Sequence, residues 1–130
     1  MTWHQLGMVA EERRDFAAAE EAYRTALEIK QTFDDQHSAA STWHQLGMVA
    51  QERRDLAAAE EAYRTALDIF VAANDEHSAA TVIGSCARLG QADPDRAEGL
   101  TAMVAGQTEM DAEDVRNLFF KAVSNAEEQA

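Results

Sequence analysis

The chain is short, acidic and poor in the residues that break helices: it has 130 residues, a net charge of −13, one proline, six glycines and one cysteine. Nucleic-acid binding normally needs a basic surface that displaces counterions from phosphates. No segment supplies one, because residues 1–40 carry 4 basic and 8 acidic side chains, 41–80 carry 3 and 7, and 81–130 carry 4 and 9.

Targeting and membrane signals are also missing from the sequence. No run approaches the roughly 18 apolar residues that a membrane span needs, and Met1 is not followed by the pattern of a signal peptide. A single cysteine cannot form an internal disulfide. We therefore expect a cytoplasmic protein that binds neither membrane nor nucleic acid.

The first eighty residues contain the same forty-residue unit twice. Residues 1–40 and 41–80 align without a gap, and thirty of the forty positions are identical, from Thr2/Thr42 to Ala40/Ala80. A period of this length is typical of stacked-repeat proteins, in which one unit cannot bury its apolar face alone. We therefore predict an all-α solenoid of helical hairpins.

Each unit contains two helices, because apolar residues recur at three- and four-residue steps. In the second unit the two apolar faces are Trp43, Leu46, Val49 and Ala50, then Leu56, Ala59, Tyr63, Ala66, Leu67 and Phe70. Between them, residues 53–55 allow only a tight turn, in which the carboxylate of Asp55 can cap the second helix. Residues 74–76, Asn-Asp-Glu, are expected to end the second helix.

The last fifty residues depart from the repeat. Residues 77–90 predict a helix that corresponds to the first helix of a third unit and ends at Gly90. Its packed face is Ala80, Ile83, Cys86, Ala87 and Leu89. Asp93-Pro94 begins a helix expected to reach Ala105, and Asp111 begins the last one. The predicted organisation is an array over 1–90 followed by a two-helix C-terminal cap over 91–130.

The two forty-residue units resemble the tetratricopeptide repeat (TPR) pattern. The matching positions are Trp43-x2-Leu46-Gly47, Ala50, Ala59, Tyr63 and Ala66 in the second unit, and Trp3, Leu6, Gly7, Ala10, Ala19, Tyr23 and Ala26 in the first. The forty-residue period is similar to the long-helix members in kinesin light chains and bacterial signalling ATPases. Two positions depart from the pattern: Val71 replaces the usual proline, which predicts a longer second helix, and Arg54 replaces the usual glycine.

The resemblance implies a right-handed TPR-like solenoid that binds proteins and has no catalytic activity. It also implies a scaffold role within a larger bacterial regulatory or signalling protein. In TPR arrays the first helices line a concave face that holds the partner. Carried over to this sequence, the partner-binding positions are His4, Gln5, Met8, Glu11, Glu12, His44, Gln45, Met48, Gln51, Glu52, Thr81, Ser85 and Arg88.

The same residues are the polar or adaptable ones that remain on these helices once the core face is removed. His and Gln offer hydrogen bonds, and Met offers a flexible apolar contact. Arg88 is the only fixed positive charge among them, whereas Glu11, Glu12 and Glu52 are acidic. A basic peptide, or a helix laid on this face, is therefore the expected partner.

Metal, cofactor and catalytic sites are not predicted. His37 and His44 lie about 10 Å apart along a helix, which is too far for one ion, and no recognisable ligand spacing includes them. Cys86 is expected to be a buried, unreactive thiol. DNA binding through the C-terminal helices is disfavoured by 3 basic against 9 acidic residues from Gln91 to Ala130.

Self-association is the alternative function. Met1 stands where Ser41 stands in the second unit, so we expect the chain to begin inside a helix and to come from a longer array. No preceding unit in the sequence covers Trp3, and an uncovered repeat end is an exposed apolar patch. End-to-end stacking of such ends would give a self-assembling structural module.

Overall fold

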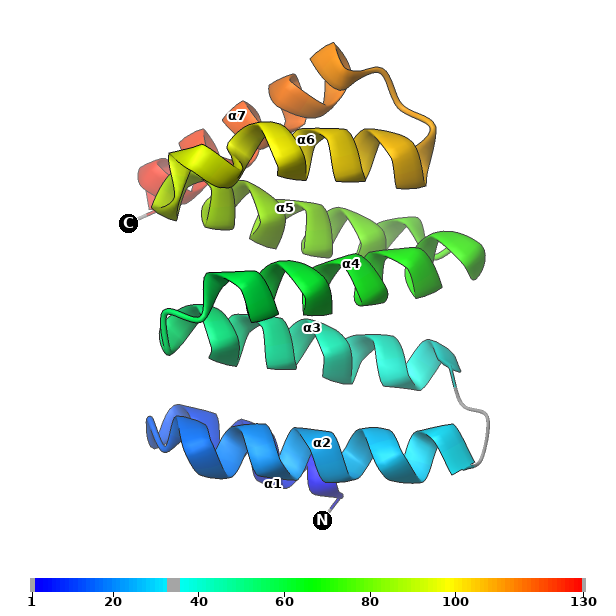
Figure 1. The fold of residues 1–130 in the computed structure, drawn as a ribbon, viewed down its shortest axis with the longest axis vertical. Helices are drawn as coiled ribbons and strands as arrows, with labels where there is room; N and C mark the ends of the chain where they lie inside the picture. The colour runs from blue at the N-terminus through cyan, green and yellow to red at the C-terminus, as the bar shows by residue number, and fades with distance from the viewer. Residues whose placement is uncertain (1, 33–35, 130) are drawn as a thin grey trace.

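The computed structural model describes residues 2–32 and 36–129, and within these ranges the chain forms helices and no strand. The helices are α1 (Trp3–Glu12), α2 (Phe16–Thr32), α3 (Gln36–Glu52), α4 (Leu56–Ala72), α5 (Glu76–Ala92), α6 (Pro94–Thr108) and α7 (Ala112–Gln129). Each packs against the next along the chain, and they stack from α1 and α2 at one end to α6 and α7 at the other (Figure 1). The predicted all-α solenoid of helical hairpins is confirmed.

The turn inside each repeat depends on an arginine in a left-handed conformation. Arg14 and Arg54 have φ values of 60° and 66°, in a region that costs a non-glycine residue about 1–2 kcal/mol. Backbone hydrogen bonds offset this cost, because the Asp55 N–H donates to the Ala50 carbonyl at 2.9 Å. The Asp55 carboxylate then accepts from the Ala58 N–H at 3.2 Å, as expected for the cap of α4.

The predicted end of the second helix at residues 74–76 is also confirmed. Asn74 has a φ of 58°, and Asp75 caps α5 by accepting from the Ser78 N–H at 3.1 Å. Because no proline interrupts it, α4 continues to Ala72. Short polar sequences therefore define both kinds of boundary.

The core of each of the first two hairpins is a tyrosine packed on a glycine. Tyr23 and Tyr63 are 0% and 1% exposed. A Cβ on Gly7 would meet the Tyr23 ring at 2.5 Å, and a Cβ on Gly47 would overlap the Tyr63 ring in the same way. The Leu-Gly pair of the repeat thus lets two helix axes approach over an aromatic ring. Of the two tryptophans, Trp43 is only partly buried and Trp3 is 46% exposed.

The start of the chain differs from the expectation. Thr2 and Gln5 form a capping box: the Thr2 hydroxyl accepts from the Gln5 N–H at 3.1 Å, and the Gln5 side chain accepts from the Thr2 N–H at 2.9 Å. The first helix therefore begins at Trp3, and the expectation that the chain begins inside a helix is wrong. Met1 itself lies outside the described residues.

Three details of the C-terminal third also differ. Gly90 does not end α5: it is buried in α5, and a Cβ there would lie 3.5 Å from Leu100 Cδ1. Gly106 lies within α6, which ends at Thr108 where Glu109 takes a φ of 60°. Ala80 is exposed, whereas its counterpart Ala40 is fully buried. The division of the chain at residue 90 into array and cap stays a prediction.

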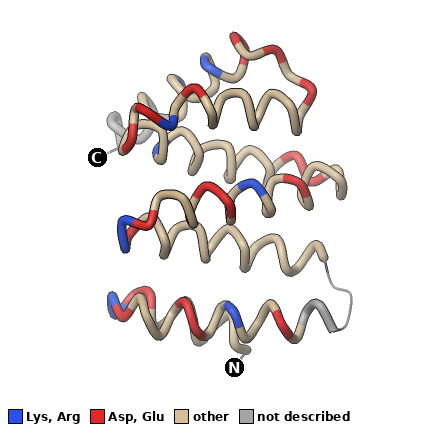
Figure 2. The backbone as a smooth tube through the Cα atoms, in the orientation of Figure 1, with Lys and Arg blue, Asp and Glu red and all other residues tan. Residues whose placement is uncertain are grey.

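Charged residues are concentrated on the second helices and the turns. Figure 2 shows α3 almost free of acidic and basic positions, whereas α2 and α4 carry both. The faces of the first and second helices therefore differ in charge (Figure 2).

Candidate functional site

The predicted partner-binding residues all lie on the first helices α1, α3 and α5, and we call the surface they share the first-helix face. The exposed members are Gln5, Met8, Glu12, Glu52, Thr81 and Arg88. The partly buried members are His4, Glu11, His44, Gln45, Met48 and Gln51, and Ser85 is buried. The structure thus divides the predicted set into residues available to a partner and residues held within the fold.

Two histidines join neighbouring first helices. His4 Nδ1 lies 2.8 Å from Thr42 Oγ1, and His44 Nε2 lies 2.7 Å from Ser85 Oγ. Both hydroxyl residues are buried, at 0% and 1% exposure. A buried hydroxyl needs a hydrogen-bond partner, so these histidines satisfy the core and fix the spacing of α1, α3 and α5.

His44 is held in its neutral form. Burial of the ring, together with the nearby Arg88 guanidinium, lowers its pKa to about 4. Arg88 Nη2 donates to Ser85 Oγ at 3.1 Å, which leaves the serine hydroxyl hydrogen available to a neutral imidazole nitrogen. His44 also contacts the Tyr63 ring, with centroids 5.8 Å apart.

Glu11 and Gln51 play the same part in the two repeats. The Tyr23 hydroxyl donates to Glu11 at 2.8 Å, and the Tyr63 hydroxyl donates to Gln51 at 2.9 Å. Burial, opposed by the tyrosine hydrogen bond and aided by Glu52 and Glu12, raises the pKa of the Glu11 carboxyl. Both side chains therefore serve the tyrosine cores of their hairpins.

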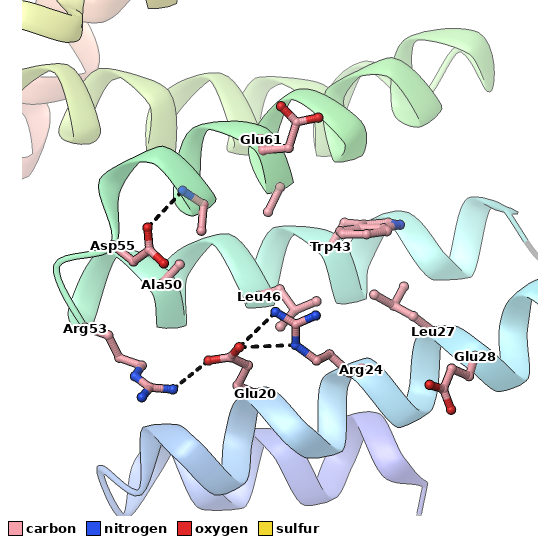
Figure 3. A pocket seen from close by; sticks show the side chains of 12 residues that line it. Glu20, Arg24, Leu27, Glu28, Trp43, Leu46, Ala50, Arg53, Asp55 and Glu61 are labelled. Atoms are coloured by element: carbon pink, nitrogen blue, oxygen red, sulfur yellow. Dashed lines mark hydrogen bonds and ion pairs between the residues drawn. The ribbon is translucent and has the colours of Figure 1, made fainter.

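A groove that the sequence reasoning missed lies on the side of the second helices (Figure 3). Its volume is about 690 Å³, and we call it the α2/α4 groove. It is lined by Glu20, Arg24, Leu27 and Glu28 of α2, by Trp43, Leu46 and Ala50 of α3, and by Arg53, Asp55, Ala58, Glu61 and Ala62 of the following turn and α4. Trp43, Leu46 and Ala50 had been expected to be simply core.

The two ends of this groove differ in charge. At the turn end, Glu20 accepts from Arg24 at 2.9 Å and from Arg53 at 2.6 Å, so the two arginines share one carboxylate. At the other end Glu28 and Glu61 lie on the rim, on either side of Trp43, as Figure 3 shows. The groove therefore has an apolar floor with an acidic rim at the tryptophan end.

A second hollow, of about 570 Å³, lies beside the start of α1. It is lined by Thr2, Trp3, His4, Gln5, Ala26, Ile29, Ser38 and Ser41. Trp3, Leu6 and Ile29 are 46%, 40% and 43% exposed. This part of the surface is apolar, as the sequence predicted for Trp3.

Within residues 2–32 and 36–129 no three His, Cys, Asp or Glu side chains come together as metal ligands would. Burial raises the pKa of the Cys86 thiol to about 12, which keeps it protonated. His37 is paired with Asp75 at 2.8 Å, and this hydrogen bond is the main reason that the pKa of Asp75 falls to about 2. In the described part of the chain, no helix combines the length and apolar character of a membrane span.

Stacked hairpins with a tyrosine-on-glycine core define a helical-repeat scaffold. The Tetratricopeptide repeat family matches residues 1–72 of the 130, and the chain belongs to this family. Repeats of this family generally mediate protein–protein interaction and are typically not enzymes. Comparisons with curated proteins and with solved structures found no match.

Proposed function

We propose that the chain binds a segment of another protein along the first-helix face. The observation that carries the proposal is the arrangement of this face. On the three first helices α1, α3 and α5, the exposed side chains include Gln5, Met8, Glu52, Thr81 and Arg88. The His4–Thr42 and His44–Ser85 contacts keep those helices in place. A preformed surface loses less conformational entropy when a partner binds.

The partner proposed for this face is a peptide or helix with basic character. Glu12 and Glu52 are exposed at the C-terminal ends of α1 and α3. Glu52 is 3.7 Å from Arg14, but both side chains are more than half exposed, at 52% and 74%. Such an exposed pair is weak, and a basic partner can compete for the carboxylate.

A peptide selection followed by point variants tests this proposal. Peptides selected from a random linear library on the immobilised chain are measured by fluorescence anisotropy against wild type, Met8→Ala and Glu52→Ala. We expect each variant to weaken binding about tenfold, because few positions carry most of the binding energy. Glu21→Ala, an exposed change on α2, is the matched control. Equal affinity for all four proteins would contradict the proposal.

The setting of this interaction is also a proposal. The TPR resemblance favours a cytoplasmic scaffold within a larger bacterial signalling protein, and the acidic, one-cysteine composition is compatible with it. Immunolocalisation of the native protein in fractionated cells tests the compartment. Recovery outside the cytoplasmic fraction would overturn it.

Self-association through the α1 end is the second candidate. It is supported by the exposed Trp3, Leu6 and Ile29 beside the hollow at the start of α1. Sedimentation velocity over a hundredfold concentration range tests it. A mass that rises from 14.3 kDa and returns to it in Trp3→Ser would support stacking. A constant mass would exclude it over that range.

A further inference from the structure

The two spaces between neighbouring second helices are built differently. Between α4 and α6 the helices touch: Arg96 Nη1 donates to Glu60 at 3.2 Å, and Gln107 Nε2 donates to the Arg64 carbonyl at 3.2 Å. Leu100 of α6 is fully buried, and it packs against Gly90 of α5. Between α2 and α4 the corresponding space is the open α2/α4 groove.

The helices α4 and α6 differ at two positions, both of which line the groove in α4. Counted from the first residue of each helix, the third position is Ala58 in α4 and Arg96 in α6, and the seventh is Ala62 in α4 and Leu100 in α6. Ala58 and Ala62 both line the groove. Where α6 has an arginine and a leucine, α4 has two methyl groups, and the groove beside them is open.

We infer that the α2/α4 groove docks an amphipathic helix of a basic partner protein. Apolar side chains of that helix enter over Trp43 and Leu46, and an Arg or Lys side chain pairs with Glu61 on the rim. In the space between α4 and α6, Arg96 pairs with Glu60 of α4, and an arginine of the docked helix would make the same kind of pair with Glu61.

Charge and shape support this occupant. The chain carries a net charge of −13, which attracts a basic partner and opposes a second copy of itself. Two neighbouring helices over a third present a furrow that accepts the side-chain ridge of another helix. A volume of about 690 Å³ accommodates a few large side chains and not a folded domain.

Trp43 supplies a local signal for the experiment. The chain has two tryptophans, so in a Trp3→Phe background the emission comes from Trp43 on the groove floor. The probe is a synthetic sixteen-residue amphipathic helix with leucines on one face and arginines beside them. A second probe carries glutamate in place of every arginine. We expect the arginine probe to shift Trp43 emission with saturation, and the glutamate probe to leave it unchanged.

Matched variants locate the probe. Glu61→Lys changes the rim, whereas Glu21→Lys makes the same charge change at the counterpart position of the first repeat, outside the groove. We expect at least tenfold weaker binding for Glu61→Lys and less than twofold for Glu21→Lys. Both residues are exposed, so folding is preserved, and circular dichroism checks it. Equal weakening by both would mean attraction by overall charge and would overturn the inference.

Filling the groove gives a second, independent variant. Ala58→Arg with Ala62→Leu copies the α6 residues into α4 and should abolish the Trp43 shift, whereas Ala57→Arg, which lies outside the groove lining, should not. Glu52→Lys on the first-helix face separates the two surfaces. Loss of the Trp43 shift in Glu52→Lys alone would overturn the groove inference and leave the proposed function standing. No shift with any probe at millimolar concentration would also overturn it.

Discussion

The interval between α2 and α4 and the interval between α4 and α6 are successive steps of one solenoid, yet one is open and the other is closed. In the closed interval Arg96 of α6 reaches Glu60 of α4 at 3.2 Å, and Leu100 of α6 is fully buried. In the open interval Glu20, the counterpart of Glu60, is reached instead by Arg53 of the preceding turn at 2.6 Å.

The difference shows how a repeat protein can vary its surface without changing its fold. The helices at the two steps are nearly equal in length, and both begin after an aspartate. The two second helices differ at their third and seventh positions, which are alanines in α4 and Arg96 and Leu100 in α6. Because each repeat contacts only its neighbours, such a change in one interval leaves the other intact.

Truncating the buried leucine of α6 should have the largest effect on stability. Leu100→Ala removes a fully buried side chain and is expected to cost about 3 kcal/mol of unfolding free energy, since little can collapse into the space. Urea denaturation measures it. Leu118→Ala, at a leucine that is 38% exposed, is the control and should cost less than about 1 kcal/mol. Similar losses for both would mean that α6 is not packed as described.

Disturbing the tyrosine-on-glycine core of the α3/α4 hairpin, which borders the open interval, should have the next largest effect on stability. Gly47→Ala places a Cβ against the buried Tyr63 ring and should cost about 2 kcal/mol by overpacking. The α5/α6 hairpin has Ala87 and Thr101 in the corresponding positions, both buried. No tyrosine ring packs on a glycine there.

Gly84→Ala is the control for this substitution. A Cβ there meets only Arg88 Nη1 at 3.7 Å, so the change should be neutral or stabilising by up to about 1 kcal/mol from helix propensity. Both variants are compared by thermal and urea unfolding. Stabilisation by Gly47→Ala would show that the ring can move aside.

Acid should weaken the contact between His44 of α3 and Ser85 of α5. The pKa of His44 is about 4 in the folded chain against 6.5 for a free histidine, so the unfolded chain binds more protons between these values. The contribution of neutral His44 is therefore complete above pH 6.5 and is lost as the pH falls toward 4. Allowing for partial exposure of the ring, we expect a loss of about 2 kcal/mol.

The measurement is the difference in unfolding free energy between wild type and His44→Gln as a function of pH. Taking the difference removes the common effect of protonating many carboxylates. We expect wild type to lose stability relative to the variant between pH 6.5 and 4. A pH-independent difference for His44→Gln would contradict the neutral, buried assignment.

Closing the open interval should have the smallest effect on stability. Ala58→Arg with Ala62→Leu is expected to add about 1 kcal/mol through newly buried apolar surface. In a Trp3→Phe background it should also reduce acrylamide quenching of Trp43, which lines the groove. Ala57→Arg should leave quenching unchanged. Destabilisation with unchanged quenching would mean that the leucine does not enter the groove.

Local sequence signals were enough to predict most of the fold. The turn aspartates Asp55 and Asp75 cap the helices that follow them, because capping involves residues only three positions apart. Tyr23 and Tyr63 were recognisable as core from the repeated helical spacing. Gly90 and Gly106 misled the prediction of helix ends, because packing or continued helical hydrogen bonding outweighs the conformational freedom of glycine.

The candidate sites depended on relations that the sequence does not display. His44 meets Ser85 across 41 positions, and Arg96 meets Glu60 across 36, so neither contact follows from a local pattern. Ala58 and Ala62 read as ordinary helix residues, and only their place against α2 makes them the wall of a groove.

Repetition and short-range capping therefore let the sequence alone determine the all-α repeat architecture, the turn positions and the tyrosine cores. Only the tertiary structure decided which first-helix residues are engaged in the core and which second-helix interval stays open. The reason is physical: helix formation and capping depend on neighbours within one turn, whereas burial of His44 and the space beside Trp43 depend on how separate helices pack.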